Sequence, residues 1–142
     1  GFGSLGGGLW ITPHVDREAL VTQSAHAAGA DASVLSFRTE LGALGDTAAV
    51  IGQAWDLAEL RAHYDQFMAD FRRLRPRGPA QTFAAQTGLV HAWRRFPFTD
   101  PDLPDDVLPR GWPRRRAHEL FHARHERWDP AAQEHFATLA PG

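Results

Sequence analysis

Residues 96–113 read FPFTDPDLPDDVLPRGWP, and this stretch decides how the second half of the chain folds. It holds five of the ten prolines, and each fixes its own φ and pushes the preceding residue toward an extended conformation. Disordered proline-rich linkers lack large apolar side chains, but here six stand among the prolines: Phe96, Phe98, Leu103, Val107, Leu108 and Trp112. We therefore expect a stiff strap that packs across helices, with a short helical turn over residues 104–108.

Helices are expected on both sides of this strap. The clearest follows Asp56, because Asp56 and Glu59 have capping-box spacing and the apolar positions 57, 60, 64, 67, 71 and 74 alternate steps of three and four. An earlier helix is predicted over residues 16–28, with Asp16 as its cap and Gly29 as its end. The later ones are predicted over residues 81–95, over 113–128, and from Pro130 with Asp129 as a cap.

Three strands are expected before residue 56. Residues 9–13 form a short apolar run, residues 35–41 alternate apolar and polar side chains, and residues 47–55 contain Val50 and Ile51. The order strand–helix–strand–strand–helix is most of a ferredoxin-like fold. We therefore predict an α+β protein with a ferredoxin-like domain over residues 1–75, a break at the prolines of residues 75–79, and an all-helical domain over 80–142.

Composition limits the function classes. Apolar residues make up 43% of the chain and charged residues 23%, with no apolar run of membrane-spanning length and no signal-peptide pattern, so we expect a cytoplasmic protein. Without cysteine there is no disulfide or thiolate site. All fifteen basic residues are arginine, which excludes lysine Schiff-base chemistry and Walker-type phosphate loops. A net charge of −2 does not suggest a nucleic-acid binder.

Two short motifs resemble catalytic or cofactor signatures. Residues 118–122 read HELFH and match the HExxH zinc signature, with His118 and His122 on one helix face and Glu119 able to activate water. His125 shares that face, but three ligands from one straight helix cannot easily surround a tetrahedral ion. We therefore expect a partly exposed helical rim, and the sequence leaves open whether these histidines bind adventitious metal. The glycines at 1, 3 and 6 fit GxGxxG but lack the preceding strand of a dinucleotide site. We predict no catalytic residue, no metal and no cofactor.

A set of longer, ordered motifs carries a family resemblance. It runs through Trp93-Arg94, Phe96-Pro97-Phe98, Asp100-Pro101-Asp102-Leu103-Pro104, Leu108-Pro109 and Trp112-Pro113, then into the helix with Ala117, Leu120-Phe121, His125 and Trp128. Gly1-Phe2-Gly3, Leu9-Trp10-Ile11-Thr12-Pro13-His14 and Ala54-Trp55-Asp56-Leu57 agree as well. In these motifs the chain resembles the central and C-terminal regions of PaaX-type transcriptional regulators, the repressors of bacterial phenylacetate-degradation operons.

The resemblance implies a partner set. Family members bind DNA through an N-terminal winged-helix domain, and we expect that domain to be absent from this chain, so that DNA would be reached only through it. The family's central domain is similar to a small CRISPR-associated nuclease fold, which agrees with the ferredoxin-like prediction. The resemblance also implies an aryl-CoA effector, and an exposed sheet edge would favour a homodimer.

The expected effector site is the basic cluster beside the strap. Guanidinium groups suit CoA phosphates and aromatic rings suit an aryl thioester. The candidate ligand-binding residues are Trp93, Arg94, Arg95, Trp112, Arg114, Arg115 and Arg116. The competing interpretation is that these arginines form salt bridges with Asp102, Asp105, Asp106 and Glu119 across a solvated face.

Two other functions stay open on the sequence. One is an enzyme, either a ferredoxin-like nuclease or an HExxH zinc hydrolase, although the first predicted strand ends without the acidic residue that a metal-dependent nuclease would need. The other is an interaction domain that only oligomerises. The regulatory portion of a PaaX-like repressor is the leading hypothesis.

Overall fold

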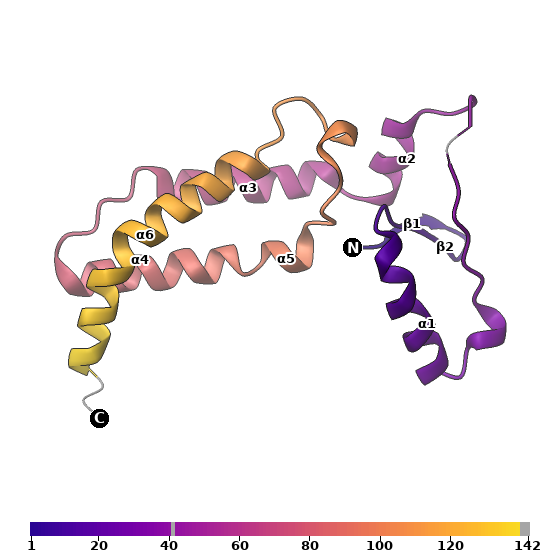
Figure 1. The fold of residues 1–142 in the computed structure, drawn as a ribbon. Coiled ribbons are helices and arrows are strands. Elements are labelled where there is room, and N and C mark those ends of the chain that lie inside the picture. Colours follow the sequence, from indigo (N-terminus) through magenta and orange to yellow (C-terminus); the bar gives the residue numbers. More distant parts are fainter. Residues whose placement is uncertain (41, 140–142) are drawn as a thin grey trace.

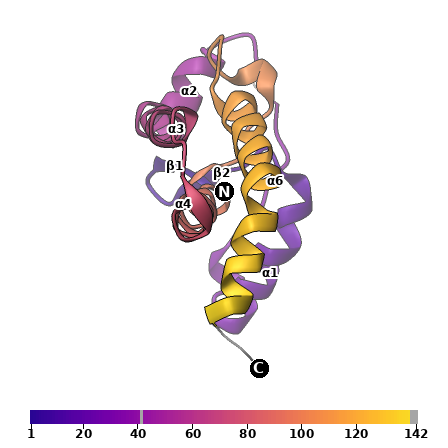
Figure 2. The same cartoon turned by 90° about the vertical axis from the view of Figure 1, so that its left-hand side faces the viewer.

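The computed structural model of the chain describes residues 1–40 and 42–139. Three long helices form its main body: α3 (Leu57–Arg72), α4 (Gly78–Trp93) and α6 (Arg114–Leu139). In Figure 1, α3 and α4 run in opposite directions, and Figure 2 shows both nearly end-on with α6 passing across them. The predicted cap of α3 is confirmed, because the Asp56 side chain accepts a hydrogen bond from the backbone nitrogen of Glu59 at 2.8 Å.

These helices share one hydrophobic core. The apolar seam predicted for α3 supplies four of its nine buried residues, which pack against residues of α4, α6 and the start of the strap. The core consists of Leu60, Tyr64, Phe67, Phe71, Ala85, Leu89, Phe96, Ala117 and Trp128. The core therefore joins α3 to the helices that follow the loop over residues 73–77.

The strap, residues 96–113, is packed as expected. It begins with the short helix α5 (Phe96–Thr99), continues as extended chain, and makes a 3₁₀ turn, η3 (Asp105–Val107), close to the predicted position. Leu103 and Leu108 are buried with Ile51 in a second apolar cluster, and Pro101 and Pro113 are buried too. Phe98 is the exception, because its ring is 89% exposed.

The ferredoxin-like prediction for residues 1–75 is wrong. The described residues contain a single two-stranded antiparallel sheet, β1 (Gly3–Gly6) and β2 (Leu9–Ile11), with Gly3 opposite Ile11. Residues 34–40 have no regular secondary structure and pair with no described strand, and Leu41 lies outside the described residues. The predicted strand over residues 47–55 is instead the helix α2 (Thr47–Ala54).

The prediction of a strand over residues 47–55 fails for a local reason. Asp46 accepts a hydrogen bond from the backbone nitrogen of Ala48 at 2.9 Å and so caps α2, while several alanines favour the helix. Val50 and Ile51 favour a strand, but their preference is outweighed. What forms before residue 56 is the small sheet, the helices α1 (Glu18–Ala27) and α2, and the 3₁₀ turns η1 (Val15–Arg17) and η2 (Asp31–Ser33), a set that we call the N-terminal segment.

Two predicted helix boundaries also need correction. Asp16 lies in η1 and does not cap α1, although Gly29 ends it with a φ of +65°. The two helices predicted on either side of Asp129 are one, because α6 runs through Pro130. Asp129 does not act as a cap there; it accepts a hydrogen bond at 3.1 Å from Gln86 of α4. Figure 1 shows α6 changing direction along its length, as an internal proline commonly causes.

Within the described part of the chain, no helix is both long and apolar enough to cross a bilayer.

Candidate functional site

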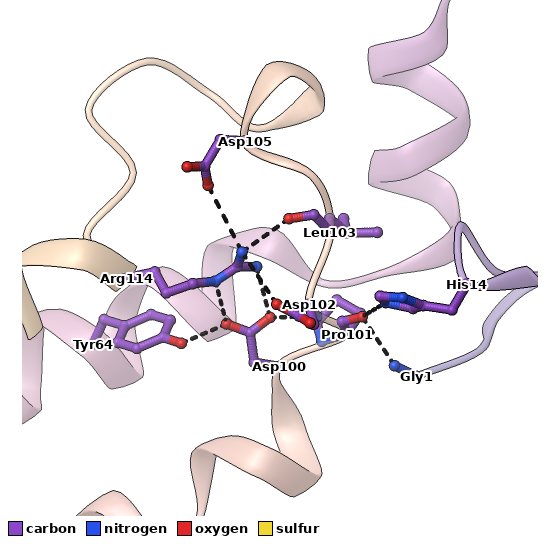
Figure 3. Close-up of polar contacts among 9 residues, drawn as sticks. All are labelled: Gly1, His14, Tyr64, Asp100, Pro101, Asp102, Leu103, Asp105 and Arg114. Carbon is purple, nitrogen blue, oxygen red and sulfur yellow. Dashed lines mark hydrogen bonds and ion pairs between the residues drawn. The ribbon is translucent and has the colours of Figure 1, made fainter. Parts of the chain in front are cut away.

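Asp100 is the centre of a polar network where the strap meets the bundle (Figure 3). The Arg114 guanidinium donates to it through two atoms, Nε to Oδ2 and Nη2 to Oδ1, each at 2.9 Å. Its third nitrogen, Nη1, donates to the carbonyl oxygen of Leu103 at 2.9 Å. Because Arg114 begins α6 and the other two residues belong to the strap, these bonds fix the strap to the helix.

Asp100 receives two further hydrogen bonds. The Tyr64 hydroxyl of α3 donates to Oδ2, and the backbone nitrogen of Asp102 donates to Oδ1 at 2.7 Å. Asp102 has a φ of +57°, a left-handed conformation that aspartate tolerates better than most residues. The short turn over residues 100–102 therefore wraps its own carboxylate while that carboxylate binds α3 and α6.

The network shifts the pKa values of its members. Burial alone would raise the pKa of the Asp100 carboxyl, but the hydrogen bonds from Arg114, Tyr64 and the Asp102 backbone outweigh it and hold that pKa below its usual value. Burial raises the pKa of the Tyr64 hydroxyl, and the bond to Asp100 raises it further. At neutral pH the network therefore consists of a neutral Tyr64, an ionised Asp100 and a charged Arg114.

The next residue in the strap reaches the N-terminal segment. The carbonyl oxygen of Pro101 lies 3.0 Å from Nε2 of His14 and 3.1 Å from the nitrogen of Gly1 (Figure 3). On the same side, Leu103 and Leu108 of the strap pack with Ile51 of α2. Asp100 and Pro101 thus stand at the junction between the bundle and the N-terminal segment.

An open cleft of about 540 Å³ lies over this junction. One wall is aromatic: Phe96 stacks on Tyr64 at a ring separation of 4.2 Å, and Trp93 lies 5.2 Å from Phe96. The rest is charged. The lining residues are Arg17, Tyr64, Trp93, Phe96, Pro97, Asp100, Asp102, Asp105, Arg114, Arg115 and His118. The lining thus combines aromatic rings with three arginines and three aspartates, and of the arginines Arg114 is already paired with Asp100.

Comparison with known proteins identifies the family. A profile described as the PaaX-like protein C-terminal domain matches residues 55–138, which is more than half of the chain. The chain belongs to the PaaX-like family. One curated relative is the transcriptional repressor PaaX of Escherichia coli strain K12, which is 32% identical over 143 residues. The alignment covers 93% of this chain and 45% of that repressor, so the chain spans less than half of its relative's length.

The PaaX-like match contains all seven candidate ligand residues, and the structure separates them. Trp93, Arg114 and Arg115 line the cleft. Trp112 lies elsewhere, half-buried between the two apolar clusters, with the Arg61 guanidinium 5.0 Å from its ring centroid. Three are exposed and are not part of the cleft lining: Arg94, Arg95 and Arg116.

Some of the salt bridges of the competing interpretation also form in this PaaX-like chain. Arg114 lies 3.5 Å from Asp102 and 3.8 Å from Asp105, and Arg115 lies 3.9 Å from Glu119. The strongest partner of Arg114 is Asp100, which was not among the acidic partners suggested from the sequence. The sequence analysis also did not identify Tyr64 as part of this site. A buried tyrosine in the seam of α3 was a signal that some acceptor had to satisfy its hydroxyl.

The HExxH motif does not form a three-ligand centre in this PaaX-like structure. Nε2 of His118 and Nε2 of His122 are 3.0 Å apart on the exposed face of α6, whereas His125 lies 4.0 Å from Asp129. Among the residues that the structure describes, no group of three potential metal ligands comes together. The ferredoxin-like nuclease alternative loses its scaffold, because the described chain has no such fold.

Proposed function

We propose that this chain is the effector-binding and dimerisation portion of a PaaX-like transcriptional repressor, and that its effector is an aryl-CoA-type metabolite. The observation that supports this most directly is the cleft, because its lining combines an aromatic wall with guanidinium groups in a chain of the PaaX-like family. The proposed role is not enzymatic and belongs in the cytoplasm. Sequence-specific DNA contact would be made by a winged-helix domain outside these 142 residues.

The cleft suits the two ends of such a ligand differently. The aryl group would lie against the half-buried ring of Trp93, beside the buried ring of Phe96. The anionic carrier would extend toward Arg115, whose side chain is 88% exposed and paired weakly with Glu119 at 3.9 Å. Arg114 is less suited to phosphate, because Asp100 and Leu103 already occupy all three of its nitrogens.

The proposed mechanism is a population shift. The cleft lining includes Arg17 from the N-terminal segment, Asp100 from the strap and Arg115 from α6, so one ligand would touch all three parts. A ligand changes an equilibrium by as much as its affinity differs between the two arrangements. An aryl-CoA that fits one arrangement of segment, strap and bundle would therefore favour it over the arrangement that supports DNA binding.

Calorimetric titration with a panel of aryl-CoA thioesters tests the effector. We expect saturable binding that neither free CoA nor the free aryl acid reproduces. Arg115→Ser should weaken binding about tenfold or more, since a charge-assisted contact to phosphate contributes about 1.5–3 kcal/mol. Arg110→Ser removes the same charge from an exposed position away from the cleft and should leave the affinity unchanged. Absence of heat with every thioester, or equal loss in both variants, would refute the effector site.

Dimerisation is supported by the surface of the N-terminal segment. A two-stranded sheet is marginally stable by itself, and the sheet of β1 and β2 leaves both outer edges unpaired by any described strand. Several apolar side chains beside it are more than half exposed: Leu9, Trp10, Val15, Leu20, Leu35 and Phe37. Burying them against a second copy would remove this apolar surface from water.

Sedimentation equilibrium tests the dimer. We expect a concentration-dependent dimer that Trp10→Asp dissociates, because Trp10 is 61% exposed in the single chain and a charge there would be buried in the dimer. Phe98→Asp is the matched control, since that ring is also exposed but belongs to the strap. A strictly monomeric wild-type chain at high concentration would overturn this part of the proposal.

A further inference from the structure

Six arginines gather at the end of the bundle where α3 gives way to α4, remote in sequence from the cleft residues of the strap. Four lie within residues 72–77 and two come from α6. Together they form what we call the arginine patch: Arg72, Arg73, Arg75, Arg77, Arg124 and Arg127. Figure 1 shows the α3–α4 loop reaching the side of the bundle over which α6 passes.

Contacts across the patch show that its two parts meet. Nη2 of Arg124 donates to the carbonyl oxygen of Arg72 at 2.5 Å, which ties α6 to the end of α3. Burial lowers the pKa of the Arg124 guanidinium, and the positive charges of Arg75 and Arg127 lower it further. The guanidinium groups of Arg75 and Arg127 are thus close enough to Arg124 to repel it.

Among the described residues, no carboxylate forms an ion pair with an arginine of the patch. Over residues 1–40 and 42–139, none of the six arginines has an acidic oxygen within 4.0 Å, whereas Arg38, Arg114 and Arg115 each do. The carbonyl groups at the end of α3 account for two of the six, since Arg75 and Arg124 donate to them. Arg73, Arg77 and Arg127 are exposed. Arg73 stands at the C-cap of α3, where a cation is favourable, whereas Arg77 at the N-cap of α4 makes no side-chain capping bond.

The chemistry of the patch selects the class of partner. Guanidinium forks match phosphate oxygens, whereas a protein partner usually needs a buried apolar anchor. The large apolar side chains here are Phe71, 8% exposed, Trp128, 3% exposed, and Leu74, 38% exposed, so little apolar surface is offered. The patch holds six of the fifteen arginines of the chain, and the acidic residues nearest to it in sequence are Asp70, Glu126 and Asp129.

We propose that the arginine patch binds the phosphate backbone of duplex DNA without reading its bases, as a second contact beside a sequence-reading domain. The choice of DNA as the polyanion rests on the proposed function, namely that the chain is part of a repressor. The binding itself depends on the patch alone. Such a contact adds affinity and orientation, while specificity is left to groups that reach the base edges.

Fluorescence anisotropy with a labelled duplex of about 20 base pairs, titrated with the whole chain at several salt concentrations, tests the contact. We expect weak binding that is the same for unrelated sequences and falls steeply with salt. Arg73→Ser with Arg77→Ser should make the slope of log K against log salt shallower by about 1.8, since each lost phosphate contact removes about 0.9. Arg38→Ser with Arg110→Ser, which changes net charge equally, should leave the slope unchanged.

Three results would overturn the proposal. The first is no salt-dependent binding at low salt, and the second is an equal change of slope in the two double variants. The third is that a polyglutamate peptide of the same charge as the duplex competes as effectively as unlabelled duplex does. That result would mean that the patch binds an acidic protein. The assay contains no aryl-CoA, so its failure leaves the effector titration unaffected, and loss of effector binding leaves the duplex result intact.

Discussion

Arg114 and Asp100 form a two-pronged ion pair, with Nε–Oδ2 and Nη2–Oδ1 distances of 2.9 Å each. The Asp100 side chain is 9% exposed and that of Arg114 23%, so solvent screens the pair only partly. Tyr64 of α3 donates to the same carboxylate, and Pro101, the next residue, contacts His14. The geometry makes this pair the point at which strap, bundle and N-terminal segment are held together.

Removing one member of the pair should destabilise the fold measurably. Arg114→Gln leaves the Asp100 carboxylate largely buried with fewer donors, and we expect the free energy of unfolding to fall by about 2–3 kcal/mol. Urea denaturation followed by circular dichroism measures this. Arg115→Gln is the control: its ion pair with Glu119 is exposed, so the change should stay below about 0.5 kcal/mol. Equal effects of the two substitutions would mean that the Arg114–Asp100 pair stabilises the fold no more than the exposed Arg115–Glu119 pair does.

Acid should remove the contribution of Asp100. Its carboxyl has a lowered pKa in the folded chain, so the stability it adds is present above the unfolded pKa of about 4 and is lost as pH falls through the folded value. Comparing the urea midpoints of wild type and Asp100→Asn across this range should show a gap at neutral pH that narrows below about pH 4. A gap independent of pH would show that the ionised carboxylate is not what the network uses.

Gly3 is required where the sheet meets α2. A Cβ at this position would lie 2.5 Å from Cε2 of Trp55 and 2.8 Å from the carbonyl oxygen of Ala54. We therefore expect Gly3→Ala to lower the free energy of unfolding by about 1–3 kcal/mol, as overpacking does. Gly52 is an exposed residue of α2, and a Cβ there would meet no atom within 4 Å. Gly52→Ala should therefore raise the free energy of unfolding by about 0.5–1 kcal/mol. Thermal unfolding compares the two; a harmless Gly3→Ala would mean that the sheet does not dock on Trp55 and Ala54.

The parts of the fold that could be predicted from sequence are those encoded locally. The cap at Asp56, the three-and-four spacing of α3 and the mixture of prolines with apolar residues in the strap each specify structure within a few residues. The predictions of strands over residues 35–41 and 47–55 share one weakness. Alternation and β-branched residues are weak signals unless a partner strand exists, and the stronger local signal at residues 46–54 was the helix cap.

The candidate site could be predicted in part. Aromatic residues and arginines near the strap indicated the region, and three of the seven candidates line the cleft. The network itself was not foreseen, because Tyr64 and Asp100 are 36 residues apart and no spacing rule links them. The three arginines that begin α6 oppose the dipole of that helix. The structure explains the first of them, since Arg114 is held by the strap carboxylate that lies before the helix.

The ionisation of Tyr64 tests most directly whether this network holds the strap on the bundle. Tyr64 is the single tyrosine of the chain, so phenolate absorbance reports on it alone. Its pKa is raised first by burial and then by the Asp100 bond, so the stability it adds is present below the unfolded pKa of about 10 and is lost as pH rises toward the folded value. We predict a midpoint well above 10 that coincides with loss of the helical signal. Reversible ionisation near pH 10 in a chain that keeps its helices would contradict the account.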